Sequence, residues 1–261
     1  MGTEARKIAN RQSPIIQTLI CLGAALVLGG CGLGLRLGGG AQKPTLLSVN
    51  PSQALFKGGY TVTLAGQNFE PGMVATIGGI PCTAMAVASA STATCVAPSL
   101  SVPGIEDVVI TTSRGSSTLP QSFTAVTYAY FPSGEAFGYG FTILPNSGQL
   151  VQNWSFFLGG VYTTTIAPHP LGTAIFFSTW ISGPPAQIAG ASIDPVTGNI
   201  GPANFVNGPA NSVFSSSLAL EPTGNFLYVT DMANGAIVCF QVTAQGGVTQ
   251  KSSVSLALSV A

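Results

Sequence analysis

The C-terminal half of the chain repeats itself about every fifty residues, and this period constrains the fold more than any other feature of the sequence. Gly148, Gly198 and Gly247 each follow turn-forming residues and lie 50 and 49 residues apart. A second pair of turns, containing Gly172 and Gly224, is separated by 52 residues. A fixed period of this size indicates repeated supersecondary units that stack on one another.

The copies can be aligned, and their strands follow from the alignment. Residues 128–144 align without a gap to residues 227–243, and residues 176–194 are the same stretch with a small insertion. Each copy then passes through a glycine-containing turn into a further apolar segment. Proline, Asn or Ser shortly before a glycine suits a tight reversal between antiparallel strands. The sequence therefore predicts a series of short antiparallel strands over residues 127–261.

The first thirty residues have the pattern of a targeting segment. Three basic residues precede an apolar stretch over 15–28, which is too short and too rich in glycine to favour a transmembrane helix. The stretch ends in Leu28-Gly29-Gly30-Cys31, which resembles the lipobox of bacterial lipoproteins. That resemblance implies a signal peptide over 1–30, lipid attachment at Cys31, and an exported protein anchored to the cell envelope, at the outer membrane or cell surface. An ordinary signal peptide with an unmodified cysteine is the alternative. The glycine-rich residues 31–43 predict a flexible tether.

Residues 44–126 predict a small antiparallel sandwich. Short alternating or β-branched runs are interrupted by Gly, Pro, Asn or Ser about every ten residues, and no helical period is sustained. The order of these elements resembles the IPT/TIG family of immunoglobulin-like domains. The elements that carry the resemblance are Val49-Asn50-Pro51, Gly58-Gly59 before residues 61–69, Gly78-Gly79 before Pro81-Cys82, Pro98, and Phe123 in the closing strand.

Many members of that family carry a cysteine pair at the positions of Cys82 and Cys95, so the resemblance implies a disulfide between them. An exported chain meets an oxidising environment, in which such a bridge persists. Two buried free thiols are the alternative. We expect no metal site, because neither a His nor a second cysteine pair accompanies them.

The repeated segment resembles the YVTN or lactonase-like β-propeller family. Residues 193–198 (IDPVTG) and 221–229 (EPTGNFLYV) carry the resemblance. The implied fold is all-β: an immunoglobulin-like sandwich followed by an incomplete β-propeller of about three blades over 127–261. Propellers have more blades than this. We favour a chain truncated after Ala261 over a last strand that returns to complete the first blade. An open arc of blades would expose sheet edges that invite pairing with other chains.

Lactonase members of that family use His, Arg and Glu in a central channel, and the repeated segment is poor in these residues. Residues 127–261 contain no Arg, one Lys and one His, His169, which replaces the acid of an Asp-Pro-x-Gly turn. We interpret His169 as a turn residue at a blade-edge loop, and Asp194, Glu221 and Asp231 likewise as turn residues. The sequence therefore predicts no catalytic, cofactor-binding or metal-binding residue.

Charge narrows the range of partners. Only 6% of the chain is charged, and the five basic side chains after residue 30 lie far apart, against seven acidic ones. Binding to phosphate backbones needs clustered Lys and Arg, so nucleic acid is excluded as a partner. The prediction is a lipid-anchored envelope binding or scaffold protein without catalysis, with a protein or glycan ligand and self-association through open sheet edges. The alternative is a fragment of a lactonase-type (6-phosphogluconolactonase-like) propeller enzyme.

Overall fold

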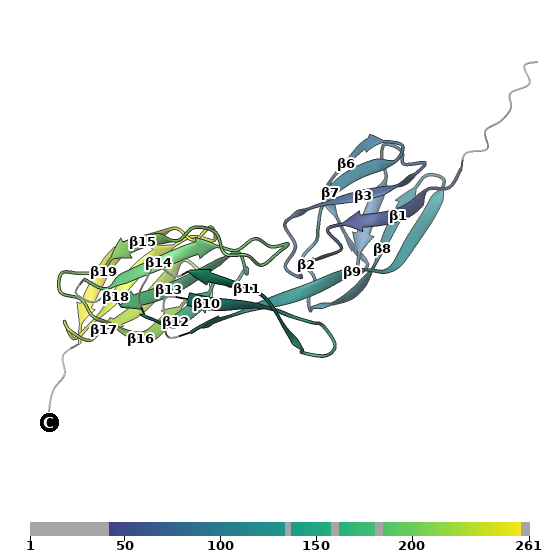
Figure 1. The fold of residues 1–261 in the computed structure, drawn as a ribbon. Coiled ribbons are helices and arrows are strands. Elements are labelled where there is room, and N and C mark those ends of the chain that lie inside the picture. The colour runs from purple at the N-terminus through teal and green to yellow at the C-terminus, as the bar shows by residue number, and fades with distance from the viewer. Residues whose placement is uncertain (1–41, 134–136, 158–161, 181–184, 257–261) are drawn as a thin grey trace, which may run out of the picture. The chain divides into compact units, whose positions relative to one another are not determined.

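The protein is described by a computed structural model over residues 42–133, 137–157, 162–180 and 185–256. These residues form strands and turns and no helix, which confirms the predicted all-β class (Figure 1). A helix with the length and hydrophobicity to span a bilayer is accordingly not found in these ranges. Cys31 and the predicted signal peptide lie outside the described residues.

Residues 45 to 126 form a sandwich of two sheets. One sheet has the order β1-β3-β7-β6, and the other contains β8, β4 and β5 beside the first part of β9, with the short β2 paired parallel to β9. Alternate side chains of both sheets point inward and are buried, as in Val62 and Leu64 against Ile110 and Phe123. The strands are β1 Thr45–Asn50, β2 Gln53–Leu55, β3 Thr61–Gln67, β4 Val74–Ile77, β5 Ile80–Pro81, β6 Thr83–Ser89, β7 Thr92–Val96, β8 Gly104–Thr112 and β9 Gly115–Pro132.

The strand β9 belongs to both parts of the structure. Its first part pairs with β8, ending at Ala125 opposite Gly104, and its last part pairs with β10, beginning at Thr127 opposite Ile143. The sandwich and the repeated segment are therefore joined within one strand and not by a linker (Figure 1). The predicted boundary between residues 126 and 127 falls inside this strand.

The repeated segment forms three antiparallel blade sheets. The first consists of the end of β9 with β10 and β11, the second has the order β12-β13-β14-β15, and the third has the order β16-β17-β18-β19. Their strands are β10 Phe137–Ile143, β11 Leu150–Phe157, β12 Tyr162–Pro168, β13 Ala174–Trp180, β14 Gln187–Ser192, β15 Asn204–Asn207, β16 Phe214–Leu220, β17 Phe226–Asp231, β18 Ala236–Val242 and β19 Val248–Ser255. The three sheets do not close into a ring within the described residues.

The second blade sheet is covered on both faces. Phe177 and Ala189 lie in a cluster with Phe156 of the first blade sheet. Phe176 and Ile188 point the other way, into a cluster with buried side chains of β17 and β18. Because both faces are covered, β13 begins with four consecutive apolar residues, 174–177, instead of an alternating pattern, and the Ser178 and Thr179 that follow are also buried.

The repeat turns match the predicted copies, with one correction. Gly172 and Gly224 close equivalent turns, in which their N–H groups donate to the carbonyls of His169 and Glu221. Both glycines have positive φ, which side-chain-bearing residues rarely adopt. In the series of turns at Gly148, Gly198 and Gly247, the residue with positive φ in the last copy is Gly246 and not Gly247. The reason is that the last turn is one residue shorter than the other two.

Candidate functional site

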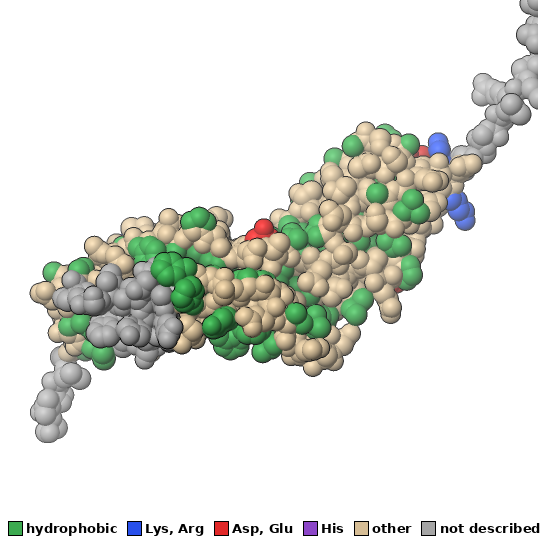
Figure 2. Space-filling view, viewed as in Figure 1, with side chains coloured by type: hydrophobic (Ala, Val, Ile, Leu, Met, Phe, Trp, Pro, Cys, Tyr) green, Lys and Arg blue, Asp and Glu red, His purple; other side chains and the backbone are tan. Residues whose placement is uncertain are grey.

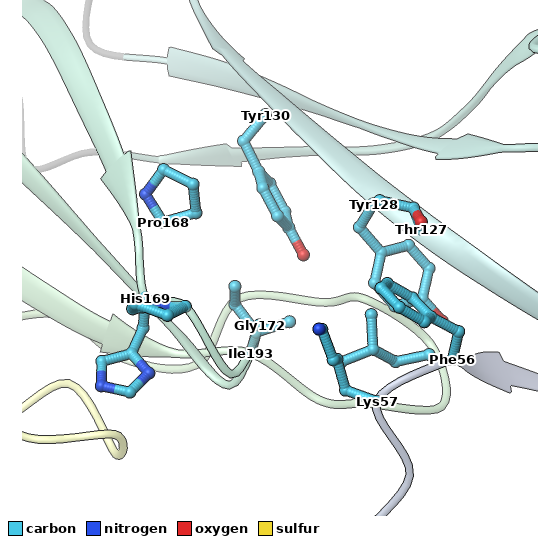
Figure 3. Close-up of a pocket in the computed structure, with 11 residues that line it drawn as sticks. Phe56, Lys57, Thr127, Tyr128, Tyr130, Pro168, His169, Gly172 and Ile193 are labelled. Carbon is cyan, nitrogen blue, oxygen red and sulfur yellow. The ribbon is translucent and has the colours of Figure 1, made fainter. Parts of the chain in front are cut away.

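A pocket lies where the sandwich meets the blade sheets (Figure 3). Its volume is about 180 Å³, which is similar to that of a cavity that holds one benzene-sized molecule. The sandwich contributes the loop after β2, β9 contributes three residues, and the turn after β12 closes the remaining side. The lining includes Lys57, Tyr128, Tyr130, His169 and Ile193.

The wall of the pocket formed by β9 is fixed by two tyrosines. The Tyr128 hydroxyl donates to the carbonyl of Val196 at 2.7 Å, and the Tyr130 hydroxyl donates to that of Gly198 at 2.8 Å. Burial raises the pKa of both hydroxyls, and the Asp194 carboxylate acts in the same direction. Both tyrosines therefore stay protonated and serve as hydrogen-bond donors to the repeat turn.

The same repeat turn also contacts the sandwich. The Leu55 N–H donates to the carbonyl of Pro195 at 2.7 Å. Inside the turn, Asp194 Oδ1 accepts from the N–H groups of Val196 at 2.8 Å and Thr197 at 3.0 Å. Asp194 thus shapes a turn that the sandwich and the first blade sheet both bind, in addition to the contact that β9 makes between them.

The charge at this pocket comes from Lys57. Its ammonium lies 4.7 Å from the centroid of the Phe56 ring, a cation–π contact that contributes about 0.5–1 kcal/mol at an exposed position. The remaining lining is mostly aliphatic or aromatic and includes Leu55, Phe56, Ile193 and the two tyrosines. Chemically, this arrangement suits a small apolar group that carries a hydrogen-bond acceptor or a negative charge toward Lys57.

His169 lies at the edge of this pocket but is engaged on both ring nitrogens. Nδ1 accepts from the Leu171 N–H at 3.2 Å, and the other nitrogen meets the backbone of Gly224 in the equivalent turn of the next blade sheet. Burial lowers the pKa of His169, and the hydrogen bond to Gly224 opposes that decrease. In Figure 3 the ring points away from Lys57 and Tyr128. The side chain is only 6% exposed, so it is a buried contact between sheets as well as a turn residue.

Two further acids among the described residues of the blade sheets, Glu221 and Asp231, also bond to backbone groups. Glu221 accepts from the Asn225 N–H at 2.8 Å and also bonds the Thr223 hydroxyl, and these hydrogen bonds lower its pKa. The buried Asp231 accepts from the Val213 N–H at 3.0 Å and from Asn234 Nδ2 at 2.7 Å. His, Cys, Asp and Glu do not gather in groups that could hold a metal ion within the residues the structure describes.

Cys82 and Cys95 are close to one another in the sandwich and are present as free thiols. Their side chains form a hydrogen bond. This bond lowers the pKa of Cys82, whereas the same bond and burial both raise the pKa of Cys95. The predicted disulfide between them stays a prediction.

We expect Cys82 and Cys95 to be bridged in the exported protein. In the chain-entropy model, a bridge that closes a loop of this length stabilises the fold by about 3 kcal/mol. Alkylation of the unfolded protein without reductant, followed by peptide mass mapping, measures the pairing. We expect modification at Cys239 and none at the pair. Alkylation of both members, with the same thermal midpoint in the presence and absence of reductant, would contradict the bridge.

Sequence reasoning did not find the pocket. Its lining comes from four separate stretches of the chain, within 55–57, 127–130 and 168–172 and at Ile193, and no local motif marks such a junction. The sequence contained one weak signal. Tyr128 and Tyr130 are two residues apart in β9, so both lie on the face of the strand that makes the hydrogen bonds.

The chain's sequence has no match among curated proteins. Several solved structures resemble it at low identity, among them the following three. A 6-phosphogluconolactonase candidate from Bacteroides fragilis is 12% identical with a TM-score of 0.40, covering 81% of this chain and 69% of its own. An auxiliary nutrient binding protein from Bacteroides thetaiotaomicron is 11% identical with a TM-score of 0.29, covering 82% and 70%. A protein from Lactobacillus plantarum is 17% identical with a TM-score of 0.40, covering 79% and 71%. Likeness of this degree says nothing about ligand or activity.

The family comparison concerns the sandwich alone. Residues 44–125 match the IPT/TIG domain, as the sequence motifs predicted. The chain therefore carries an IPT/TIG domain, whose last strand continues directly into the blade sheets.

Proposed function

We propose that this chain is a lipid-anchored binding or scaffold protein of the cell envelope, in which the IPT/TIG domain carries the blade sheets as an interaction head. The observation that supports it best is the junction. The strand β9 and the repeat turn at Pro195 hold the two parts together without a linker. Such a connection keeps the blade surfaces and the pocket in a fixed position on the domain, which suits a scaffold.

The chemistry of the described blade residues supports binding over catalysis. General acid–base catalysis needs titratable groups that converge on a pocket. His169, Asp194, Glu221 and Asp231 each bond to nearby backbone groups instead. The pocket presents one cation and two tyrosine hydroxyls that already donate to carbonyls.

The catalytic alternative is tested at His169. We expect no hydrolysis of glucono-δ-lactone above the uncatalysed rate, and we expect His169→Ala to lower the thermal midpoint. His169→Asn is the matched control, because its amide oxygen can still accept from the Leu171 N–H, so we expect it to be more stable than His169→Ala. A lactonase rate in the unmodified protein that both substitutions abolish would overturn the binding proposal in favour of an enzyme.

Binding itself is measured with purified peptidoglycan and with a glycan array as probes. Retention of the folded protein on either probe, and not of the same protein unfolded by heat, supports the proposed role. Failure on both probes together with lactone turnover contradicts it.

The lipid anchor is tested separately at Cys31. We expect the protein expressed in a bacterial host to enter the detergent phase on Triton X-114 partitioning, and Cys31→Ser to move it to the aqueous phase. Each buried methylene of an acyl chain contributes about 0.8 kcal/mol to membrane binding, so the shift should be nearly complete. Mass spectrometry that finds an unmodified Cys31 in membrane-extracted protein would reject the anchor.

A further inference from the structure

Each of the two outer blade sheets carries exposed apolar side chains on the face that no described residue covers. In β17, Leu227 and Val229 point toward the second blade sheet and are buried, whereas Phe226 and Tyr228 point away from it and are exposed. A sheet with one face in water ordinarily alternates apolar and polar residues. These strands instead resemble β13, which is covered on both sides.

The first outer face belongs to β9, β10 and β11. Register places Phe131 opposite Tyr139 and Phe137 opposite Phe157, so these side chains share one face. Phe137 and Phe157 meet edge to face at 5.5 Å, and Phe157 is still 63% exposed. We define the first outer face as Phe131, Phe137, Tyr139, Leu150 and Phe157, all of which are exposed.

The second outer face lies at the other end of the stack, on the third blade sheet. Register places Tyr228 opposite Cys239 and Ile237 opposite Val254, and these four residues share a face with Phe226. We define the second outer face as these five residues, of which Phe226, Tyr228 and Val254 are exposed. The residues that define the two outer faces are uncharged, and the nearest described charge on the third blade sheet is the exposed Lys251, at the bulge of β19 beside Ser252.

The face of the third blade sheet that is equivalent to the first outer face is covered inside the molecule. The third blade sheet turns the pairs Val229–Val238 and Leu227–Phe240 toward its neighbour, and all four are buried. The corresponding pair in the first blade sheet is Phe131–Tyr139, with side chains 48% and 39% exposed. Among the described residues, the first blade sheet thus leaves uncovered a surface of the kind that elsewhere receives another blade sheet.

We propose that a second copy of this chain covers these surfaces, with the second outer face of one copy packed against the first outer face of the next. The contact continues the existing stack, in which one side of each blade sheet meets the opposite side of its neighbour. Such an interface joins two different surfaces, so it is heterologous and can extend from copy to copy or close into a ring. Figure 2 shows hydrophobic side chains gathered over the blade sheets, while the Lys and Arg visible on this side lie on the IPT/TIG domain.

The test uses one substitution on each outer face in the full chain, with Cys31→Ser throughout to separate self-association from the lipid. Phe157→Asp places a charge on the first outer face, and Tyr228→Asp places one on the second. Both positions are exposed, so circular dichroism and thermal unfolding should resemble those of the parent. Val102→Asp, at an exposed apolar position of the sandwich, is the matched control. Sedimentation velocity over the micromolar range gives the assembly state.

We expect the parent and Val102→Asp to sediment faster as concentration rises, and each outer-face variant alone to sediment as a monomer. An equimolar mixture of Phe157→Asp and Tyr228→Asp should form a one-to-one dimer and nothing larger, because one intact face of each kind remains. That recovery also shows that both variants are folded. A parent chain that stays monomeric overturns the proposal. So does a Tyr228→Asp protein that still dimerises alone, because that would mean a symmetric contact. The result does not depend on the lipid anchor or on a ligand.

Discussion

Gly58→Ala is expected to lower the free energy of unfolding by about 3–5 kcal/mol, because it combines an unfavourable backbone conformation with a steric overlap. Gly58 lies in the loop after β2, with φ of 66°, a conformation that costs an L-residue about 1–2 kcal/mol. A Cβ at this position would lie 2.3 Å from the carbonyl oxygen of Pro98. That oxygen belongs to the backbone and cannot rotate away, so the overlap adds to the conformational cost.

Gly59 provides the matched control. Its φ of 85° is also positive, but a Cβ there would meet nothing within 4 Å. Gly59→Ala should therefore lose only the conformational part, about 1–2 kcal/mol. Urea unfolding of both variants, monitored by circular dichroism, gives the two values. Equal losses would show that the contact with Pro98 is not the cause.

The same loop contributes to the pocket, so Gly58 also connects stability with the candidate site. Leu55, which accepts from the Gly58 N–H, donates its own N–H to the repeat turn at Pro195. A displaced loop would move both Lys57 and that contact. We therefore expect Gly58→Ala to loosen the junction on which the proposed scaffold role depends.

The glycine motifs allowed much of the fold to be predicted. The pair Gly58-Gly59 pointed to the IPT/TIG domain, and Gly172 and Gly224 do close equivalent turns. Such motifs are local, because a positive φ selects glycine whatever surrounds the turn. Contacts between distant turns leave no such mark. His169 was expected at a blade-edge loop, and nothing in the sequence indicated that its ring would meet Gly224, 55 residues later.

The alignment of the copies also predicted the wrong register for one strand, β9. The ungapped alignment equates Tyr128 with Leu227, yet the two approach the second blade sheet from opposite sides. It does equate Phe141 with Phe240, in agreement with the strand pairs Ala129–Phe141 and Leu227–Phe240. The error is one residue in β9. In strands that are apolar on both faces, a shift of one residue leaves the hydrophobic pattern unchanged, so the sequence cannot detect it.

Phe176→Ala is expected to lower the free energy of unfolding by about 3–5 kcal/mol, because it removes a large side chain from the centre of the stack. Phe176 has no exposed surface and lies between the second and third blade sheets, where its ring is 6.5 Å from that of His169. The cavity would be surrounded by side chains of two sheets, such as Val229 and Phe240, which cannot all collapse into it.

Phe205→Ala is the matched control for this prediction. Phe205 also contacts another ring, that of Phe177 at 6.3 Å, but it lies on the edge strand β15 and is exposed. Its loss should cost no more than about 1 kcal/mol.

Calorimetry of Phe176→Ala shows whether the loss of stability is confined to the blade sheets. Because β9 belongs to both the IPT/TIG domain and the first blade sheet, we expect one transition, shifted to lower temperature as a whole. The contradicting result is two transitions, one for the blade sheets at a lower temperature and one for the IPT/TIG domain at an unchanged temperature. It would mean that β9 does not couple the unfolding of the two parts. The fixed junction on which the scaffold proposal rests would then have to be abandoned.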